Sequence, residues 1–310
     1  AQEKNILTEG ILASERSKPD VMESILTRAR ELGRARAELV FRTKYKGLFS
    51  KALMAGAFDV VADASPEKVG AQNKERFYAP ALNSKPGMKF IYQGGEASTL
   101  AEGSFSAVVA DYDSVGDMTH LRQVSCNTTG LTSILGYLIR ALGLHLKVDN
   151  QAIRRDVDAG DLKGGTVSIL FSAAYHHGPD ARTAFTNEEN GFVVELNTDA
   201  AQAGGSMTRF HIHALLVRTA DGKPLDKKAV QRALAMQSRV ALVDYPNGKF
   251  DTTRLAEMNL NLLPQQLPWV PEGANHPLVP TVTVWETDDP SEVMLVYAVP
   301  QESIVAAGNV

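Results

Sequence analysis

The segment from Val124 to Leu131 constrains this chain more than any other part of its sequence. It reads Val-Ser-Cys-Asn-Thr-Thr-Gly-Leu and leads directly into an apolar helical pattern. From residue 131 to 142, leucine and isoleucine recur at spacings of three and four, which predicts one buried face of a helix. Asn127 and Thr128 are residue types that cap helix N-termini, so we expect the helix to begin there. The single cysteine, Cys126, is therefore predicted to lie at or just before a helix N-terminus.

Cys126 has two interpretations. A free cysteine is often a small, buried apolar residue without chemical function. At a helix N-terminus, however, unpaired backbone N–H groups and the helix dipole favour an anion, so the thiol loses its proton more easily and becomes a nucleophile. The polar neighbours Ser125, Asn127, Thr128 and Thr129 favour the second interpretation. We therefore expect a catalytic thiolate at Cys126.

The composition excludes several classes of protein. The 310 residues are 44% hydrophobic and 22% charged, an ordinary globular composition that is large enough for two domains. The net charge of -4, without a long block of like charge, predicts no nucleic-acid partner. No apolar run reaches the roughly 18 residues that a membrane span requires, so we expect no membrane association. A single cysteine excludes an internal disulfide and is typical of a reducing cytoplasm.

The two halves of the chain predict different architectures. Strands at residues 6–13, 58–64 and 89–92, with a helix from residue 19 to about residue 39, predict an open α/β sheet that binds ligands at the carboxyl ends of its strands. From residue 144 on, hairpin-like spacing predicts a mostly antiparallel sheet with one buried face. Its strands are predicted at residues 147–155, 166–171, 191–196, 208–217, 282–285 and 293–299, with a helix at 226–236, a loop at 175–180 and a surface excursion at 265–280.

Two further clusters are candidates for chemistry. His211 and His213 alternate with Ile212 on a predicted strand, so both imidazoles lie on one face, either as buried structural histidines or with one as a catalytic base. Zinc normally needs three or four ligands, and no cysteine or carboxylate stands at a recognised spacing, so no metal site is predicted. Arg154 and Arg155, at a strand end, form either a solvated pair or an anion site.

Together these features fit one class of reaction. A thiolate attacks an aldehyde that carries a phosphate, and an imidazole takes the hydroxyl proton as hydride leaves for a nicotinamide cofactor. The resulting thioester is released to phosphate or water. Helix-end N–H groups and hydroxyls are suited to hold the anionic groups of such a substrate.

At these residues the chain resembles archaeal-type (type II) glyceraldehyde-3-phosphate dehydrogenase. Several ordered blocks carry the resemblance, which spans roughly residues 58 to 305: residues 92–96, 125–131, 154–155, 176–180 and 293–305. It implies an α/β fold, with a Rossmann-type nucleotide-binding domain in residues 1–125, an α+β catalytic domain in 126–299, and a return of residues 300–310 towards the first domain.

The resemblance also implies a role for individual residues. Cys126 is the nucleophile and His211 the catalytic base of a phosphorylating dehydrogenase. The triose phosphate contacts Ser125, Asn127, Thr128, His177 and Gly178, and NAD or NADP contacts Gly95, Arg155 and Gln301. Inorganic phosphate is the second substrate, and the enzyme is a cytoplasmic homotetramer of glycolysis.

The chain departs from the family pattern at both ends. The opening strand with its Gly-x-Gly-x-x-Gly turn and the closing helix are absent from the sequence. We therefore expect an incomplete sequence with weak affinity for the cofactor. Two alternatives remain open: a dehydrogenase of another aldehyde, or a catalytically silent paralogue in which Cys126 senses oxidants.

Overall fold

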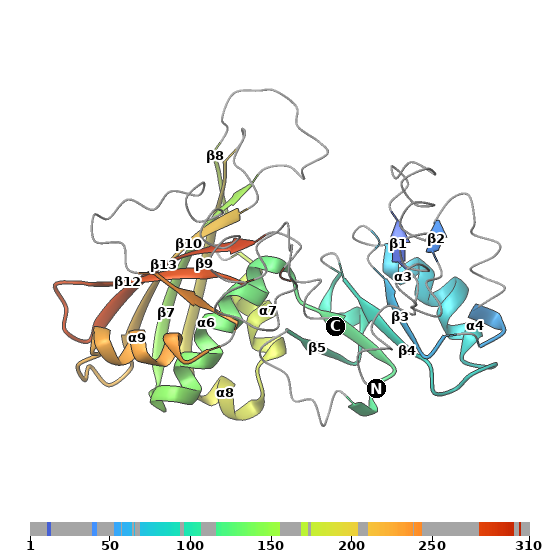
Figure 1. The fold of residues 1–310 in the computed structure, drawn as a ribbon, viewed down its shortest axis with the longest axis horizontal. Helices are drawn as coiled ribbons and strands as arrows, with labels where there is room; N and C mark the ends of the chain where they lie inside the picture. Colours follow the sequence, from blue (N-terminus) through green and yellow to red (C-terminus); the bar gives the residue numbers. More distant parts are fainter. Residues whose placement is uncertain are drawn as a thin grey trace, which may run out of the picture. The chain divides into compact units, whose positions relative to one another are not determined.

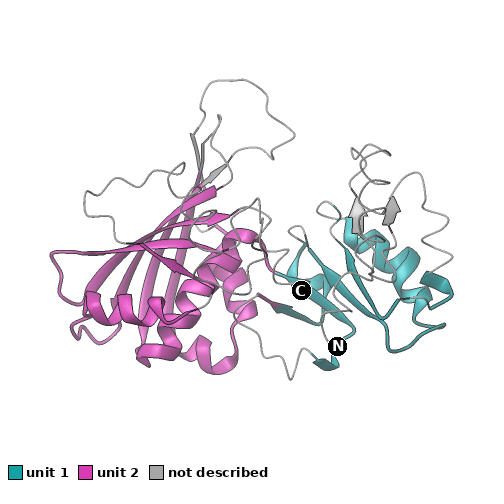
Figure 2. Ribbon diagram, in the orientation of Figure 1, with its two compact units in different colours: residues 1–104, 112–123, 310 teal, residues 105–111, 124–309 magenta. Residues whose placement is uncertain are grey.

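The computed structural model divides into two compact units. Unit 1 comprises residues 1–104, 112–123 and 310, and unit 2 comprises residues 105–111 and 124–309 (Figure 2). The structure describes residues 11–13, 39–41, 53–56, 58–63, 65, 69–93, 96–106, 116–155, 169–172, 175–203, 210–237, 239–243, 279–300 and 304. The domain boundaries after residues 125 and 299 stay a prediction.

Unit 1 contains a four-stranded sheet in the order β3-β4-β6-β5. Its strands are β3 (Val60–Asp63), β4 (Lys89–Tyr92), β6 (His120–Gln123) and β5 (Gly103–Phe105), and β3, β4 and β6 run parallel. Helical turns α3 (Val69–Asn73), η1 (Lys74–Tyr78) and α4 (Ala79–Ala81) connect β3 to β4 (Figure 1). The predicted parallel sheet is thus confirmed for the strands expected at residues 58–64 and 89–92, whereas residues 11–13 of the strand expected at 6–13 belong to a separate sheet.

A small aromatic core stabilises unit 1. Tyr78 stacks on Phe90 with ring centroids 4.5 Å apart, and both side chains are almost fully buried. Two strands that the sequence did not predict as such, β5 and β6, extend the sheet beyond β4. A separate parallel pair joins β1 (Ile11–Ala13) to β2 (Leu39–Phe41). Residues 19–38 of the helix predicted at residues 19–39 lie outside the described residues. Its last predicted residue, Leu39, belongs to β2.

Unit 2 contains a seven-stranded sheet in the order β11-β12-β13-β10-β7-β9-β8. Its strands are β7 (Leu146–Arg155), β8 (Ile169–Ser172), β9 (Val193–Ala203), β10 (Phe210–Thr219), β11 (Ala241–Leu242), β12 (Thr281–Glu286) and β13 (Glu292–Pro300). The pairs β12–β13, β13–β10, β10–β7 and β9–β8 are antiparallel, whereas β11–β12 and β7–β9 are parallel. The prediction of a mostly antiparallel sheet is therefore confirmed.

Four helices cover one face of this sheet (Figure 1). They are α6 (Cys126–Leu142), α7 (His177–Ala184), α8 (Asn187–Phe192) and α9 (Lys227–Ala235). The predicted apolar face of α6 is confirmed, because Leu131, Leu135 and Leu138 are completely buried in a single core with the sheet. Gly143 ends α6 in the left-handed conformation, with φ of 60°, which glycine adopts without strain. No helix in the described ranges is long and apolar enough to cross a membrane.

Two local predictions in unit 2 are wrong. Residues 175–180 were predicted as a loop, but α7 begins at His177. Pro179 is compatible with this helix because it lies in the first turn, where a backbone N–H makes no hydrogen bond within the helix. The strand predicted from residue 191 begins only at Val193, because α8 occupies the preceding residues. The opening of α9 is as expected: the Asp226 side chain accepts hydrogen bonds from the backbone nitrogens of Lys228 and Ala229. Most of the predicted surface excursion, residues 265–278, lies outside the described residues.

Candidate functional site

The first turn of α6 carries the cysteine. The predicted capping by Asn127 and Thr128 is wrong, since Ser125 is the N-cap residue and its side chain accepts a hydrogen bond from the backbone nitrogen of Thr128 at 3.4 Å. Cys126 is therefore the first helical residue, and its side chain is only partly buried. Both features meet the conditions for a reactive thiol: exposure to reagents and the positive end of a helix dipole.

Asn127 links the first turn of α6 to the sheet beneath it. Its Oδ1 lies 2.8 Å from Nε2 of His213 on β10, and Nδ1 of His213 lies 3.1 Å from Oδ1 of Asn150 on β7. The imidazole also stacks on Tyr297 of β13, with ring centroids 4.7 Å apart and planes 14° from parallel. Burial raises the pKa of the Tyr297 hydroxyl well above its ordinary value, so this group stays neutral. Three neighbouring strands thus fix one imidazole against the residue that follows Cys126.

His211, the predicted catalytic base, lies two positions before His213 on β10. The alternating burial along this strand places both imidazoles on the same buried face, as predicted from the sequence, and His211 is 3% exposed. Its neighbour on β13 is Val299, and a Cβ atom on Gly130 of α6 would lie only 2.4 Å from Cγ2 of this valine. The lack of a side chain at Gly130 therefore lets α6 approach the sheet closely next to His211.

Hydroxyl groups connect α6 to α7. Oγ of Ser125 lies 3.0 Å from Oγ1 of Thr128, which in turn lies 3.3 Å from Nδ1 of His177. Thr128 and His177 are almost completely buried, whereas Ser125 is partly exposed. The structure thus brings together three of the predicted substrate-binding residues, from the first turns of two helices.

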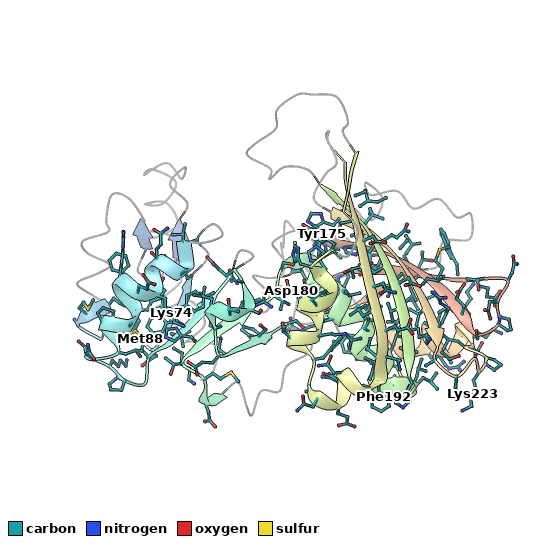
Figure 3. The ribbon with its side chains drawn as sticks, turned by 180° about the vertical axis from the view of Figure 1, so that it is seen from behind. Lys74, Met88, Tyr175, Asp180, Phe192 and Lys223 are labelled. Carbon is teal, nitrogen blue, oxygen red and sulfur yellow. The ribbon has the colours of Figure 1, made fainter. Side chains whose placement is uncertain are left out.

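The fourth predicted residue of this group, Gly178, is fixed by β9. Its backbone nitrogen donates a hydrogen bond of 2.9 Å to Oγ1 of Thr198, and this hydroxyl donates to the backbone oxygen of Tyr175. Tyr175 precedes α7 and Asp180 lies within its first turn (Figure 3). Thr198 was not predicted as a site residue, since a threonine within a strand carries no motif.

The three predicted cofactor-binding residues are not tested by these contacts. Gly95 and Gln301 lie outside the described residues, and for Arg155 the structure describes the backbone at the end of β7 but not the side chain. The predicted absence of a metal site is likewise untested, although no cluster of three or more metal-ligating side chains occurs within the described part of the chain.

The carboxyl edge of the parallel sheet in unit 1 carries polar groups. Asp63, at the end of β3, is 1% exposed and accepts hydrogen bonds from the backbone of Ser65, from Asn73 and from Tyr78. Gln93 directly follows β4, and Gln123 is the last residue of the adjacent strand β6. Nε2 of Gln93 and both side-chain polar atoms of Gln123 are buried and find no hydrogen-bond partner among the residues that the structure describes. Unsatisfied buried amides of this kind call for an explanation, such as a ligand.

Comparison of the sequence with curated proteins finds relatives that are named glyceraldehyde-3-phosphate dehydrogenase. The chain is 34% identical to a glyceraldehyde-3-phosphate dehydrogenase of Pyrobaculum arsenaticum over 262 residues, which are 82% of this chain and 68% of that protein. It is 31% identical to the enzyme of the same name from Archaeoglobus fulgidus over 259 residues, with coverage of 81% and 68%. The Halobacterium salinarum protein of that name is 36% identical over 203 residues, 64% of this chain and 55% of its own. No family model matches the chain.

The fold has a counterpart among solved structures. The crystal structure of aspartate semialdehyde dehydrogenase II from Vibrio cholerae superposes with a TM-score of 0.59 and 12% sequence identity, covering 97% of this chain and 96% of that one. At this identity the likeness concerns the fold alone. It agrees with the predicted fold class, an α/β chain with a Rossmann-type parallel sheet and a second, mostly antiparallel sheet.

Proposed function

This chain belongs to the archaeal-type glyceraldehyde-3-phosphate dehydrogenase family, whose members are oxidoreductases acting on an aldehyde, and from that premise we propose that it is a phosphorylating glyceraldehyde-3-phosphate dehydrogenase. The observation that supports this most is the position of Cys126 as the first residue of α6, with its neighbours Asn127 and Thr128 bound to the buried histidines His213 and His177. This arrangement supplies a thiolate next to groups that bind and orient a polar substrate.

The first step is addition of the Cys126 thiolate to the aldehyde carbon of glyceraldehyde 3-phosphate. A carbon–sulfur bond forms, and the carbonyl electron pair moves to the oxygen, which takes up a proton to give a thiohemiacetal. The first turn of α6 favours this step, because its unpaired N–H groups stabilise the thiolate before attack. Cys126 is partly exposed, as the approach of a substrate to its sulfur requires.

His211 then acts as the base. It accepts the proton of the thiohemiacetal hydroxyl while hydride leaves the same carbon, so a thioester forms on Cys126. The nicotinamide of NAD or NADP, when bound, supplies the hydride acceptor. His211 lies on the buried face of β10.

Inorganic phosphate releases the product. A phosphate oxygen attacks the thioester carbon, the carbon–sulfur bond breaks, and 1,3-bisphosphoglycerate leaves while the Cys126 thiolate is restored. Two phosphate groups therefore need sites. The hydroxyls of Ser125 and Thr128 and the side chain of His177, in the first turn of α7, offer donors suited to these anions, whereas the backbone N–H of Gly178 already donates to Thr198.

Unit 1 fits a dinucleotide cofactor. Its parallel strands are of the kind that bind nucleotides at their carboxyl ends, where Gln93 and Gln123 carry buried amide groups without hydrogen-bond partners in the described ranges. In unit 1 these are the residues that would hold NAD or NADP, and the assignment of Gly95, Arg155 and Gln301 to the cofactor rests on the family resemblance alone.

The test is an assay of the purified protein with glyceraldehyde 3-phosphate, inorganic phosphate and either NAD or NADP, followed by the absorbance of the reduced cofactor. We expect steady turnover that requires phosphate, whereas omission of phosphate should limit the reaction to a burst of thioester formation on Cys126. The Cys126→Ser variant should lose nearly all activity, because a hydroxyl is a much poorer nucleophile than a thiolate at neutral pH.

The same assay separates the alternatives. Turnover of non-phosphorylated glyceraldehyde at an equal rate would identify a dehydrogenase of another aldehyde. No turnover with any aldehyde, combined with rapid and reversible oxidation of Cys126 by hydrogen peroxide, would favour the thiol-sensing paralogue. Either result would refute the proposed substrate.

A further inference from the structure

We propose that His213 is a positioning residue that fixes the side-chain amide of Asn127, so that its N–H groups, and not its oxygen, face the substrate bound at Cys126. His213 does not touch the reacting atoms in this proposal; it acts through Asn127. The inference deepens the proposed function and rests on it for the identity of the substrate. It assigns separate tasks to the two histidines of β10, with His211 as the base and His213 as the support of a hydrogen-bond donor.

The geometry around His213 leaves its ring little freedom. The residue has no exposed surface, and its ring stacks on Tyr297 at a centroid distance of 4.7 Å. Nε2 lies 2.8 Å from Oδ1 of Asn127, and Nδ1 lies 3.1 Å from Oδ1 of Asn150. Rotation of the ring would break the stacking and both polar contacts together. The ring therefore sits in one orientation, with Nε2 towards the helix that carries Cys126.

The two contacts require one ring nitrogen of His213 to donate and the other to accept. A neutral imidazole has one donor and one acceptor, so it cannot donate to two amide oxygens. Nδ2 of Asn150 is buried and has no hydrogen-bond partner in the part of the chain that the structure describes. Exchange of the amide oxygen and nitrogen of Asn150, which differ little in shape, would place this donor against Nδ1. The network that gives Nδ2 of Asn150 a partner is therefore Asn150 N–H to Nδ1 of His213, and Nε2–H of His213 to Oδ1 of Asn127.

This network determines which end of the Asn127 amide is available. Because Oδ1 accepts from His213, the amide group cannot exchange its two ends without placing its NH₂ group against the Nε2–H donor. The N–H groups of Asn127, the residue after Cys126, then remain as the donors that we assign to the aldehyde oxygen, which gains negative charge on thiolate attack. A preorganised donor at that position stabilises the transition state more than the bound substrate.

Two substitutions at His213 separate the two contacts. A glutamine places its amide nitrogen about where Nε2 stands, whereas an asparagine places its amide near Nδ1 and does not reach Asn127. We expect His213→Gln to keep kcat within about threefold of wild type, and His213→Asn to lose about tenfold or more, as for one lost hydrogen bond. The loss should fall on kcat more than on KM, because the donor acts as charge develops. Equal activity of the two variants would overturn the proposal.

A double-variant cycle tests whether His213 acts through Asn127. His213→Phe keeps an aromatic ring against Tyr297 but removes both ring nitrogens, and Asn127→Ala removes the proposed donor. If His213 acts through Asn127, the two losses in kcat should not add in the double variant. Additive losses would show that His213 acts independently. The rate of Cys126 alkylation by iodoacetamide serves as the control, and it should change less than about threefold, because alkylation develops no charge on a carbonyl oxygen.

A measurement on the wild-type protein is independent of activity and of how the variants fold. Nitrogen NMR of histidine-labelled protein, with the signal of His213 assigned by its absence in His213→Phe, reports which ring nitrogen carries the proton. We expect a neutral ring with the proton on Nε2. A proton on Nδ1, or on both nitrogens near neutral pH, would overturn the proposal. If glyceraldehyde 3-phosphate is not a substrate, the proposed function fails, while this measurement still decides the role of His213.

Discussion

The backbone nitrogen of Gly178 lies 2.9 Å from Oγ1 of Thr198 and donates a hydrogen bond to it. The first turn of α7 therefore rests directly on β9. A Cβ atom at residue 178 would stand 2.9 Å from the same oxygen and 3.2 Å from the backbone oxygen of Leu196. The backbone oxygen cannot move aside as the end of a flexible side chain can. This close approach explains a glycine inside the first turn of a helix, where glycine otherwise lowers helix stability.

Gly178→Ala should therefore displace the start of α7. We expect a loss of about 1–3 kcal/mol in the free energy of unfolding of unit 2, as for other overpacked sites, and a raised KM for glyceraldehyde 3-phosphate. Gly191→Ala is the matched control, because a Cβ atom at Gly191 of α8 meets nothing within 4 Å. The control should be neutral or slightly stabilising. Urea unfolding followed by tryptophan fluorescence and steady-state kinetics measure both effects, and equal behaviour of the two variants would contradict this account.

Ser125→Ala removes the N-cap of α6. We expect a loss of about 1 kcal/mol in stability, together with slower alkylation of Cys126, because the first turn no longer has a fixed geometry. Asp226→Ala is the control: Asp226 caps α9 through hydrogen bonds of 3.1 Å to the backbone nitrogens of Lys228 and Ala229, outside the candidate site. Both variants should lose similar stability, but only Ser125→Ala should slow alkylation. A normal alkylation rate in Ser125→Ala would show that the cap serves stability alone.

The sequence predicted α6 as an element but not its first residue. The spacing of its leucines and isoleucines defines a buried face, and the structure buries that face from Leu131 to Ile139 and partly at Leu142. In the run Ser-Cys-Asn-Thr-Thr, however, several residues are good N-caps, so residue type does not select one. The structure selects Ser125, and this choice leaves the Asn127 side chain to contact His213. Tertiary contacts thus decide a boundary that local preferences leave open.

The two short helices of unit 2 were missed for different reasons. In α7 the pair Gly178-Pro179 is typical of a turn, and eight residues hold too little periodicity to outweigh it. In α8 a visible signal existed, because Thr186 and Glu189 form a capping box, with hydrogen bonds of 3.2 Å and 2.9 Å between side chains and backbone. Weighting that motif above the β-branched residues that follow would have predicted the helix.

The sequence predicted which residues belong to the candidate site better than it predicted which residues contact each other there. The alternation His-Ile-His predicted that both imidazoles share a face, and β10 confirms it. The partners of His213 come from neighbouring strands: Asn150 from β7 and Tyr297 from β13. Strand order and register bring them together, and a single sequence specifies neither, because many pairings satisfy the same alternation of buried and exposed residues.

His177 offers a second test of the substrate site. His177→Ala should raise KM for glyceraldehyde 3-phosphate about tenfold to a hundredfold, which corresponds to the roughly 1.5–3 kcal/mol of a hydrogen bond to a charged group. The adjacent His176 is the control: its ring packs on that of His177 with centroids 4.3 Å apart, but its side chain is 55% exposed and its contact with Asp180, at 3.9 Å, is a weak surface pair. His176→Ala should leave KM within about twofold. If both variants bind the substrate as wild type does, His177 has only a structural role beside Thr128.

His120 should make unit 1 sensitive to acid. Its side chain is buried, and Nδ1 lies 2.8 Å from the Tyr92 hydroxyl. Burial lowers the pKa of His120 below its ordinary value of 6.5. The charge of Lys74 lowers this pKa further, whereas Glu102 opposes the shift. As the pH falls below about 6.5, the unfolded chain binds a proton that the folded chain does not bind. The free energy of unfolding should therefore decrease until the pH reaches the pKa of the folded state.

Hydrogen exchange of β4 and β6 at about pH 7.5 and about pH 5.5, corrected for intrinsic rates, measures this decrease. His120→Phe keeps an aromatic ring against Phe90 and should remove the decrease, although it also loses the Tyr92 hydrogen bond at both pH values. An equally steep decrease in His120→Phe would assign the acid sensitivity of unit 1 to its carboxylates instead.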